Sequence, residues 1–124
     1  MPYQMTWEEH GISVRYSGMT SDREVADFAK TGQADRRFDD LRYVLHDFRA
    51  CEGATYSTPV IEELSATDEA AAASNPRIRI AVVTDRPDVS AMVEAYLKVG
   101  LSIFPLRMFS GIEEARDWLN AGIR

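Results

Sequence analysis

Near the start of the chain, apolar and polar residues alternate with the two-residue period of β-strands. Residues 3–7 and 12–16 both show this alternation, and the polar stretch 8–11 between them ends in a glycine. A half-buried strand needs one apolar face, and a short polar segment with glycine is typical of a tight turn. The pattern therefore predicts a β-hairpin.

Helical and strand signals then alternate along the rest of the chain. Four stretches combine helical spacing with an N-terminal signal, either a serine–glutamate capping box or a proline in the first turn: residues 21–32, 58–74, 87–99 and 110 onwards. Three apolar runs have the length of strands: residues 41–48, 78–83 and 105–109. This order predicts an α/β fold with a mixed, mostly parallel sheet of about five strands and about four helices.

Composition limits the surface that this fold can present. The 124 residues include 14 basic and 20 acidic side chains, a formal charge of -6. Nucleic acid and anionic lipid both require basic surfaces, so we exclude them as partners. No run of about 20 apolar residues predicts a membrane span, and the N-terminal residues are unlike a signal peptide. We expect a single cytoplasmic domain over residues 1–124.

Few residues offer recognisable catalytic or metal chemistry. The glycines are scattered and form no phosphate-binding loop. Cys51 is the only cysteine, and its neighbour His46 lies in a predicted strand, so a packed histidine and an inert cysteine are the better interpretation. Asp47 and Asp85 end predicted strands as in a response-regulator receiver, but no lysine follows the last strand. We therefore predict a non-enzymatic protein with no cofactor and no metal.

Ligands of open α/β sheets gather at the carboxyl ends of the strands. Asp47 marks one predicted strand end, and Asp85 and Arg86 follow another. We therefore expect these residues on a common strand-end surface, formed by residues 17–20, 49–58 and 84–87.

Four hydroxyl groups lie at the start of the second predicted helix, on Thr55, Tyr56, Ser57 and Thr58. Free backbone amides and the helix dipole favour negative charge at such a position. An ordinary helix cap explains these residues, and a phosphoacceptor or anion site is the functional interpretation.

The order of elements resembles the STAS domain of anti-sigma-factor antagonists and sulfate-transporter tails. The run 41–48 is similar to the family's central strand, which typically ends in aspartate and a hydrophobic residue. The helix start at 55–58 falls where the family carries D-S-x-G with a phosphorylated serine. Further short runs look like small bacterial SpoIIAA-like proteins: residues 1–4, 7–8, 37–43 and 112–119. The resemblance covers nearly the whole chain.

This resemblance implies a regulatory module that binds a protein partner, such as an anti-sigma-like kinase, or a second copy of itself. The sequence departs from D-S-x-G, because Tyr56 falls at the phosphoserine position with Ser57 and Thr58 beside it. We therefore expect a degenerate phosphoacceptor site, with Asp47 and Thr55 as further partner-binding candidates.

An alternative function is a small carrier of a lipid-like or other apolar ligand. Large flexible or aromatic side chains occur on the predicted helices: Phe28, Met92, Tyr96 and Trp118. Such residues usually form a packed core, whereas a carrier would arrange them around a concave apolar cavity. A homodimer, through the hairpin edge or the third predicted helix, is compatible with either function.

Overall fold

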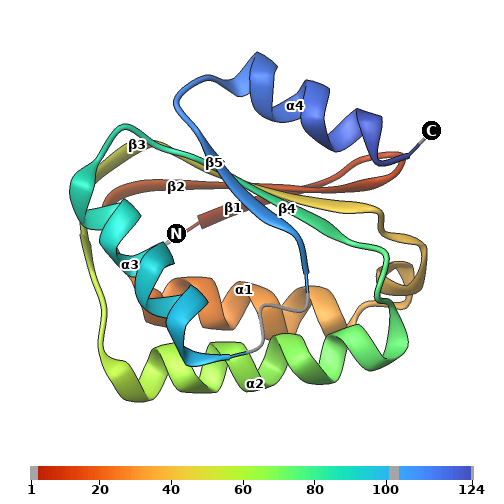
Figure 1. The fold of residues 1–124 in the computed structure, drawn as a ribbon, viewed down its shortest axis with the longest axis horizontal. Coiled ribbons are helices and arrows are strands. Elements are labelled where there is room, and N and C mark those ends of the chain that lie inside the picture. The colour runs from red at the N-terminus through yellow and green to blue at the C-terminus, as the bar shows by residue number, and fades with distance from the viewer. Residues whose placement is uncertain (1–2, 101–103, 124) are drawn as a thin grey trace.

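A five-stranded sheet lies between two helical layers of unequal size (Figure 1). The computed structural model describes residues 3–100 and 104–123. The strands are β1 (Tyr3–Trp7), β2 (Gly11–Ser21), β3 (Tyr43–Thr55), β4 (Arg79–Val83) and β5 (Leu106–Phe109). The helices are α1 (Asp22–Ala34), the 3-10 helix η1 (Arg36–Asp40), α2 (Thr58–Ser74), α3 (Pro87–Val99) and α4 (Ile112–Ala121). The predicted α/β order of strands and helices is confirmed.

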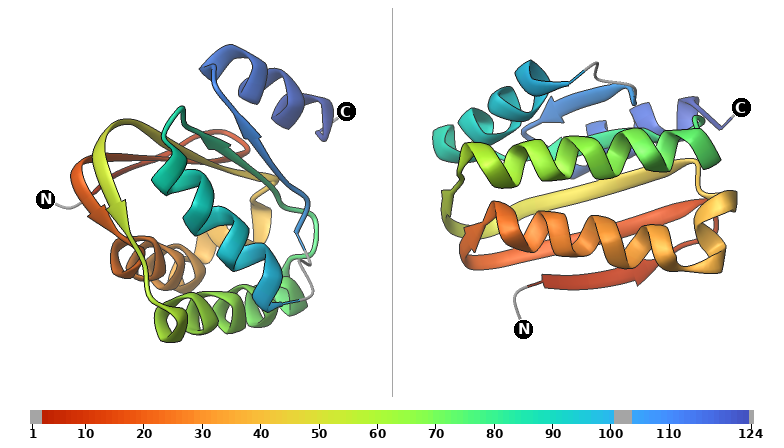
Figure 2. Two further views of the ribbon diagram at one scale, coloured as in Figure 1. Left: turned by 60° about the vertical axis from the view of Figure 1, so that its left-hand side comes forward. Right: turned by 90° about the horizontal axis from the view of Figure 1, so that it is seen from below.

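The strands lie in the sheet in the order in which they occur in the chain. β1 is antiparallel to β2, and the other three neighbouring pairs are parallel, as predicted. Right-handed crossovers that all step in the same direction place their helices on one face of a sheet. Accordingly α1, α2 and α3 cover one face and α4 covers the other (Figures 1 and 2).

Each helical layer has its own apolar core. The larger cluster lies between the sheet and helices α1, α2 and α3, and includes the buried side chains of Val14, Tyr16 and Ile61. The smaller cluster lies under α4, where Ala115 and Leu119 pack against β3 and β4. The alternation of β2 follows from this division, because its apolar residues face the larger core and its polar residues face the side that α4 covers only in part.

An ion pair ties the hairpin turn to α4. Glu8 accepts two hydrogen bonds from Arg116, both of 3.0 Å, and one from Tyr43. The hydrogen bonds from Arg116 lower the pKa of Glu8, even though partial burial opposes its ionisation. Burial and the hydrogen bond to Glu8 raise the pKa of Tyr43 to about 12.

β2 and β3 are longer than the sequence pattern predicts. Residues 17–20 and 49–55, expected as strand-end loops, belong to these strands, and the pairing of β2 with β3 continues to Ser21 and Thr55. Two irregularities in the register, between Arg15 and Ser17 and between Gly18 and Met19, break the alternation on which the prediction rested. Residues 53–59 are rich in glycine, proline and hydroxyl side chains and predict a loop, but the first three of them belong to β3, so this prediction is wrong for them.

Two local predictions differ from the structure. Arg36 and Arg37 precede Asp39 and Asp40, and this pattern predicts a connecting loop with a local ion-pair cluster. The segment is instead the helix η1, and Arg37 pairs with Asp35. The serine–glutamate capping box expected at residues 110–113 does not form, because α4 begins one residue later and Gly111 is its N-cap. None of the described helices is both long and apolar enough to cross a membrane.

Candidate functional site

The start of α2 presents a polar segment to solvent. Ser57 is the N-cap of α2, and residues 55–58 are all exposed, with Tyr56 at 46%. The Ser57 side chain makes no capping hydrogen bond, so its hydroxyl is not used to close the helix. The four hydroxyl groups predicted at this position are therefore accessible.

A buried carboxylate fixes the position of this segment against α1. The Ser57 amide donates a hydrogen bond of 2.8 Å to Oδ2 of Asp22, whose residue is only 5% exposed. Asp22 is the first residue of α1, and Ser21 and Glu24 form the predicted capping box around it. The start of α2 and the start of α1 are thus held together by one charge-assisted hydrogen bond.

Met19 and Arg86 lie beside the end of β3. Met19 is 70% exposed, and a Cβ built on Gly53 would lie 2.6 Å from its Cε, so the Met19 side chain covers Gly53. Arg86 pairs with Asp88, which also accepts a hydrogen bond from the Ala54 amide. The hydrogen bond from Arg86 lowers the pKa of Asp88. We call residues 55–58, Met19 and Arg86 together the α2 rim.

Asp47 does not reach the α2 rim, contrary to the prediction that it ends a strand. It lies eight residues before Thr55 within β3, a separation of roughly 25 Å along an extended strand. Burial opposes the ionisation of Asp47, but hydrogen bonds from Arg49 outweigh it and lower its pKa. Asp85 follows β4 as predicted and is exposed, next to Arg86 at the start of α3.

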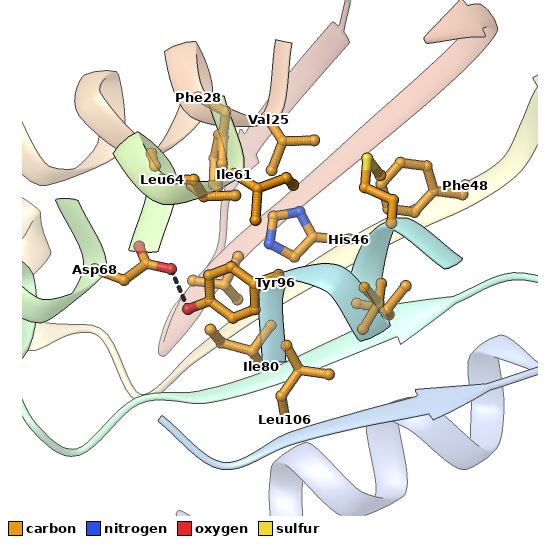
Figure 3. Close-up of a pocket in the computed structure, with 15 residues that line it drawn as sticks. Val25, Phe28, His46, Phe48, Ile61, Leu64, Asp68, Ile80, Tyr96 and Leu106 are labelled. Carbon is orange, nitrogen blue, oxygen red and sulfur yellow. Dashed lines mark hydrogen bonds between the residues drawn. The ribbon is translucent and has the colours of Figure 1, made fainter. Parts of the chain in front are cut away.

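An apolar cavity of about 90 Å³ lies between the sheet and the three-helix layer (Figure 3). Its lining is mainly aliphatic and aromatic, from α1, α2, α3 and strands β3, β4 and β5. Three of the four side chains that the sequence offered for an apolar ligand line it: Phe28, Met92 and Tyr96. The fourth, Trp118, lies on α4 and packs on the other face of the sheet.

Three polar side chains also line the cavity. His46, on β3, is 9% exposed, and burial lowers the pKa of its imidazole to about 4, so the ring is neutral at physiological pH. Asp68 on α2 accepts a hydrogen bond of 2.6 Å from Tyr96 on α3. Burial raises the pKa of Asp68 to about 6, and it also raises the pKa of Tyr96. Asp68 and Tyr96 are half-buried, so their hydrogen bond links α2 to α3 where the cavity approaches the surface.

No local sequence pattern links His46 and Asp68, which belong to a predicted strand and a predicted helix, to one site. A packed histidine and an inert cysteine are predicted at positions 46 and 51, and the structure agrees that the two do not pair, because the Cys51 thiol donates to the Gly53 carbonyl and His46 bonds to Tyr16. A histidine within an otherwise apolar run was the one available signal. Over residues 3–100 and 104–123, no three histidine, cysteine, aspartate or glutamate side chains gather to hold a metal ion.

Comparison with known proteins places the fold. No protein-family model matches the chain, and no curated protein matches it. The solved structure of the anti-sigma factor antagonist SpoIIAA in its unphosphorylated form matches with a TM-score of 0.60 and 12% identity, over 95% of this chain and 97% of that chain. The chain has the SpoIIAA fold.

Two further structures match. The Bacillus cell fate determinant SpoIIAA in its phosphorylated form gives a TM-score of 0.57 and 13% identity, over 94% of this chain and 98% of that chain. An uncharacterised Shewanella loihica protein of the DUF3478 family, with a SpoIIAA-like fold, gives a TM-score of 0.49 and 10% identity, over 94% of this chain and 91% of that chain. The two SpoIIAA structures confirm, at the level of the fold, the resemblance to STAS and SpoIIAA-like proteins seen in the sequence. A SpoIIAA fold alone does not assign a function.

Proposed function

We propose that this protein is a non-enzymatic regulatory module that binds a protein partner through the α2 rim. The observation that carries the proposal is the exposure of residues 55–58 together with Met19 at one edge of the sheet. Methionine and tyrosine are enriched at protein interfaces, and here Met19 and Tyr56 are both exposed beside accessible hydroxyl and charged groups. SpoIIAA, which has the same fold, is described as an anti-sigma factor antagonist, and this supports a regulatory role.

Phosphorylation of Ser57 or Thr58 would regulate this surface electrostatically. A phosphate adds a charge of about -1.5 to -2. On Ser57 it would lie close to Asp22, whose carboxylate accepts the Ser57 amide hydrogen. The α2 dipole favours the new charge, whereas Asp22 repels it. The segment 55–58 would then move relative to α1, and a partner fitted to the unmodified rim would bind less tightly.

The proposed partner is a protein such as an anti-sigma-like kinase. We also propose a cytoplasmic location for the complex, a single domain over residues 1–124 and no cofactor. SpoIIAA itself has been solved in a phosphorylated form, which supports phosphorylation as the regulating event. Self-association through the edge of β1 would occupy another surface, whereas self-association through α3 would begin next to Arg86 of the α2 rim.

Phosphopeptide mapping tests the regulatory part of this proposal. The protein is isolated from its natural host under several growth conditions, and peptides that contain residues 55–58 are analysed by mass spectrometry. We expect a phosphate on Ser57 or Thr58, and we expect the double variant Ser57→Ala, Thr58→Ala to make binding of the partner insensitive to kinase treatment. Binding that stays sensitive to the kinase in the double variant would rule out these two residues as the switch.

The cavity supports a second function, that of a carrier for a small apolar ligand. A concave apolar space with a few polar groups and perturbed pKa values is the usual form of a ligand site. Here the space is about 90 Å³, and its polar groups are His46, Asp68 and Tyr96. Native mass spectrometry of freshly purified protein should show an added mass that disappears on denaturation. A bare protein mass, together with failure to bind any small apolar probe, would exclude the carrier function.

A further inference from the structure

The buried pair of Tyr16 and His46 fixes which imidazole nitrogen carries the proton. Tyr16 is fully buried, and its hydroxyl lies 3.0 Å from Nδ1 of His46. A buried hydroxyl needs an acceptor for its proton, and within the described part of the chain Nδ1 is the acceptor that Tyr16 has. Tyr16 therefore donates to Nδ1, and the proton of the neutral ring is on Nε2.

The Nε2–H group of His46 is a donor directed into the cavity. Figure 3 shows the imidazole in the middle of the lining residues, with Tyr96 and Asp68 to one side of it. Among residues 3–100 and 104–123, Nε2 has no hydrogen-bond partner, although the His46 residue is only 9% exposed. In this part of the chain, Thr20 Oγ1 is the fully buried side-chain atom without a partner, so Nε2 is not sealed off from small molecules. Since His46 lines the cavity, an acceptor from outside the chain that enters the cavity can reach this donor.

The size of the cavity limits what can supply that acceptor. A cavity of about 150 Å³ holds benzene, so about 90 Å³ suits roughly four non-hydrogen atoms of a compact ligand, and a slightly larger ligand would extend toward the surface. The lining residues include neither lysine nor arginine, and the Asp68 carboxyl group would repel an anion. A cation would have to lie against the Nε2–H donor of His46, and the Asp68 carboxylate already accepts the hydrogen bond from Tyr96. Burying a charge that is not fully paired is costly, so we take the ligand to be neutral.

We infer that the cavity binds a small, neutral, mostly apolar ligand whose single acceptor oxygen receives a hydrogen bond from Nε2–H of His46. A ketone, an ether or an alcohol has this chemistry. The inference rests on the carrier function proposed above and adds the group that selects the ligand. His46, which the sequence indicates as a packed core residue, would thus select which ligand binds.

A matched pair of probes tests the inference by NMR titration. Cyclobutanone has an acceptor oxygen, and methylenecyclobutane has nearly the same shape without one. Both are titrated into the wild-type protein and into His46→Leu, and the ratio of the two dissociation constants is compared. One hydrogen bond to the protein predicts that the preference for the ketone falls about fivefold in His46→Leu. The control Ile61→Val, which alters the lining but no donor, should keep the wild-type ratio.

A second measurement keeps the test decisive if His46→Leu does not fold, because that substitution leaves the buried Tyr16 hydroxyl without its acceptor. In the wild-type protein, the Nε2 resonance of His46 should shift with cyclobutanone but not with methylenecyclobutane. If both probes bind and Nε2 responds to neither, the selecting role of His46 is wrong while the carrier function stands. If neither probe shifts the resonances of the lining residues, the carrier function and the inference both fail.

Discussion

Replacing Ala29 with leucine would fill part of the cavity from the α1 side. Ala29 is half-buried and lines the cavity. Leucine has one of the highest helix propensities among large residues, so it fits the interior of α1. Cavities in protein cores cost about 24 cal/mol per Å³, so 90 Å³ corresponds to an upper limit of about 2 kcal/mol. Because one side chain fills only part of the space, we expect Ala29→Leu to raise the free energy of unfolding by about 1 kcal/mol.

Urea unfolding measures this change. The midpoint concentration should rise in Ala29→Leu while the m-value stays constant, because the surface exposed on unfolding barely changes. Ala70→Leu, at an exposed position of α2, is the control for helix propensity and should leave the midpoint nearly unchanged. Cyclobutanone binding should be lost in Ala29→Leu and retained in Ala70→Leu.

A fall in the free energy of unfolding of Ala29→Leu would contradict this prediction. Inserting carbon atoms into a core that is already filled costs about 1–3 kcal/mol. A loss of stability of that size in Ala29→Leu, with a folded control, would mean that the space beside Ala29 is not available to a side chain or to a ligand.

Three further predictions concern polar groups that are buried or half-buried. The His46 ring should titrate by NMR with a midpoint near pH 4, and a midpoint near 6.5 would contradict its burial. Between pH 6.5 and 4 the unfolded chain takes up this proton while the folded protein does not, so the free energy of unfolding should fall by about 3 kcal/mol over this range. Glu8→Gln should lower the free energy of unfolding by about 1 kcal/mol at neutral pH. This loss should shrink as the pH falls below 4.5, because Arg116 lowers the pKa of Glu8 in the folded protein and the interaction is lost when Glu8 is protonated. A loss that is the same at neutral and at acidic pH would contradict the pairing with Arg116. Asn75→Ala should lower the free energy of unfolding in urea by about 2–3 kcal/mol, because the Asn75 side chain donates to the carbonyls of the buried residues Phe38 and Leu41. A loss below about 1 kcal/mol would argue against these hydrogen bonds.

The order of elements was predictable because several local signals agree. The apolar run of β4 and the first-turn prolines Pro59 and Pro87 each indicate their element without help from the rest of the fold. The second half of β3 was not predictable in this way. Arg49 and Glu52 are exposed there, and the bulged register removes the alternation, so only the pairing with β2 keeps these residues in the sheet.

The two candidate sites differ in how far the sequence revealed them. The exposure of residues 55–58 follows from their position at the start of a helix, which local patterns indicate. The cavity depends on how the side chains of three helices and the sheet fill the space between them. Asp68 looks like a solvent-exposed acid on α2 until α3 brings Tyr96 within 2.6 Å, and the free nitrogen of His46 is determined by Tyr16, 30 residues away.

Site-specific photocrosslinking in the natural host tests most directly whether the α2 rim binds a protein. A benzophenone amino acid is placed at Tyr56 in the rim, and at the exposed Asn120 on α4 as the control. We expect one adduct of defined mass from Tyr56, none from Asn120, and a weaker Tyr56 adduct when Ser57→Asp is added. Absence of an adduct at Tyr56, or equal adducts at both positions, would contradict the proposal that this surface binds the partner.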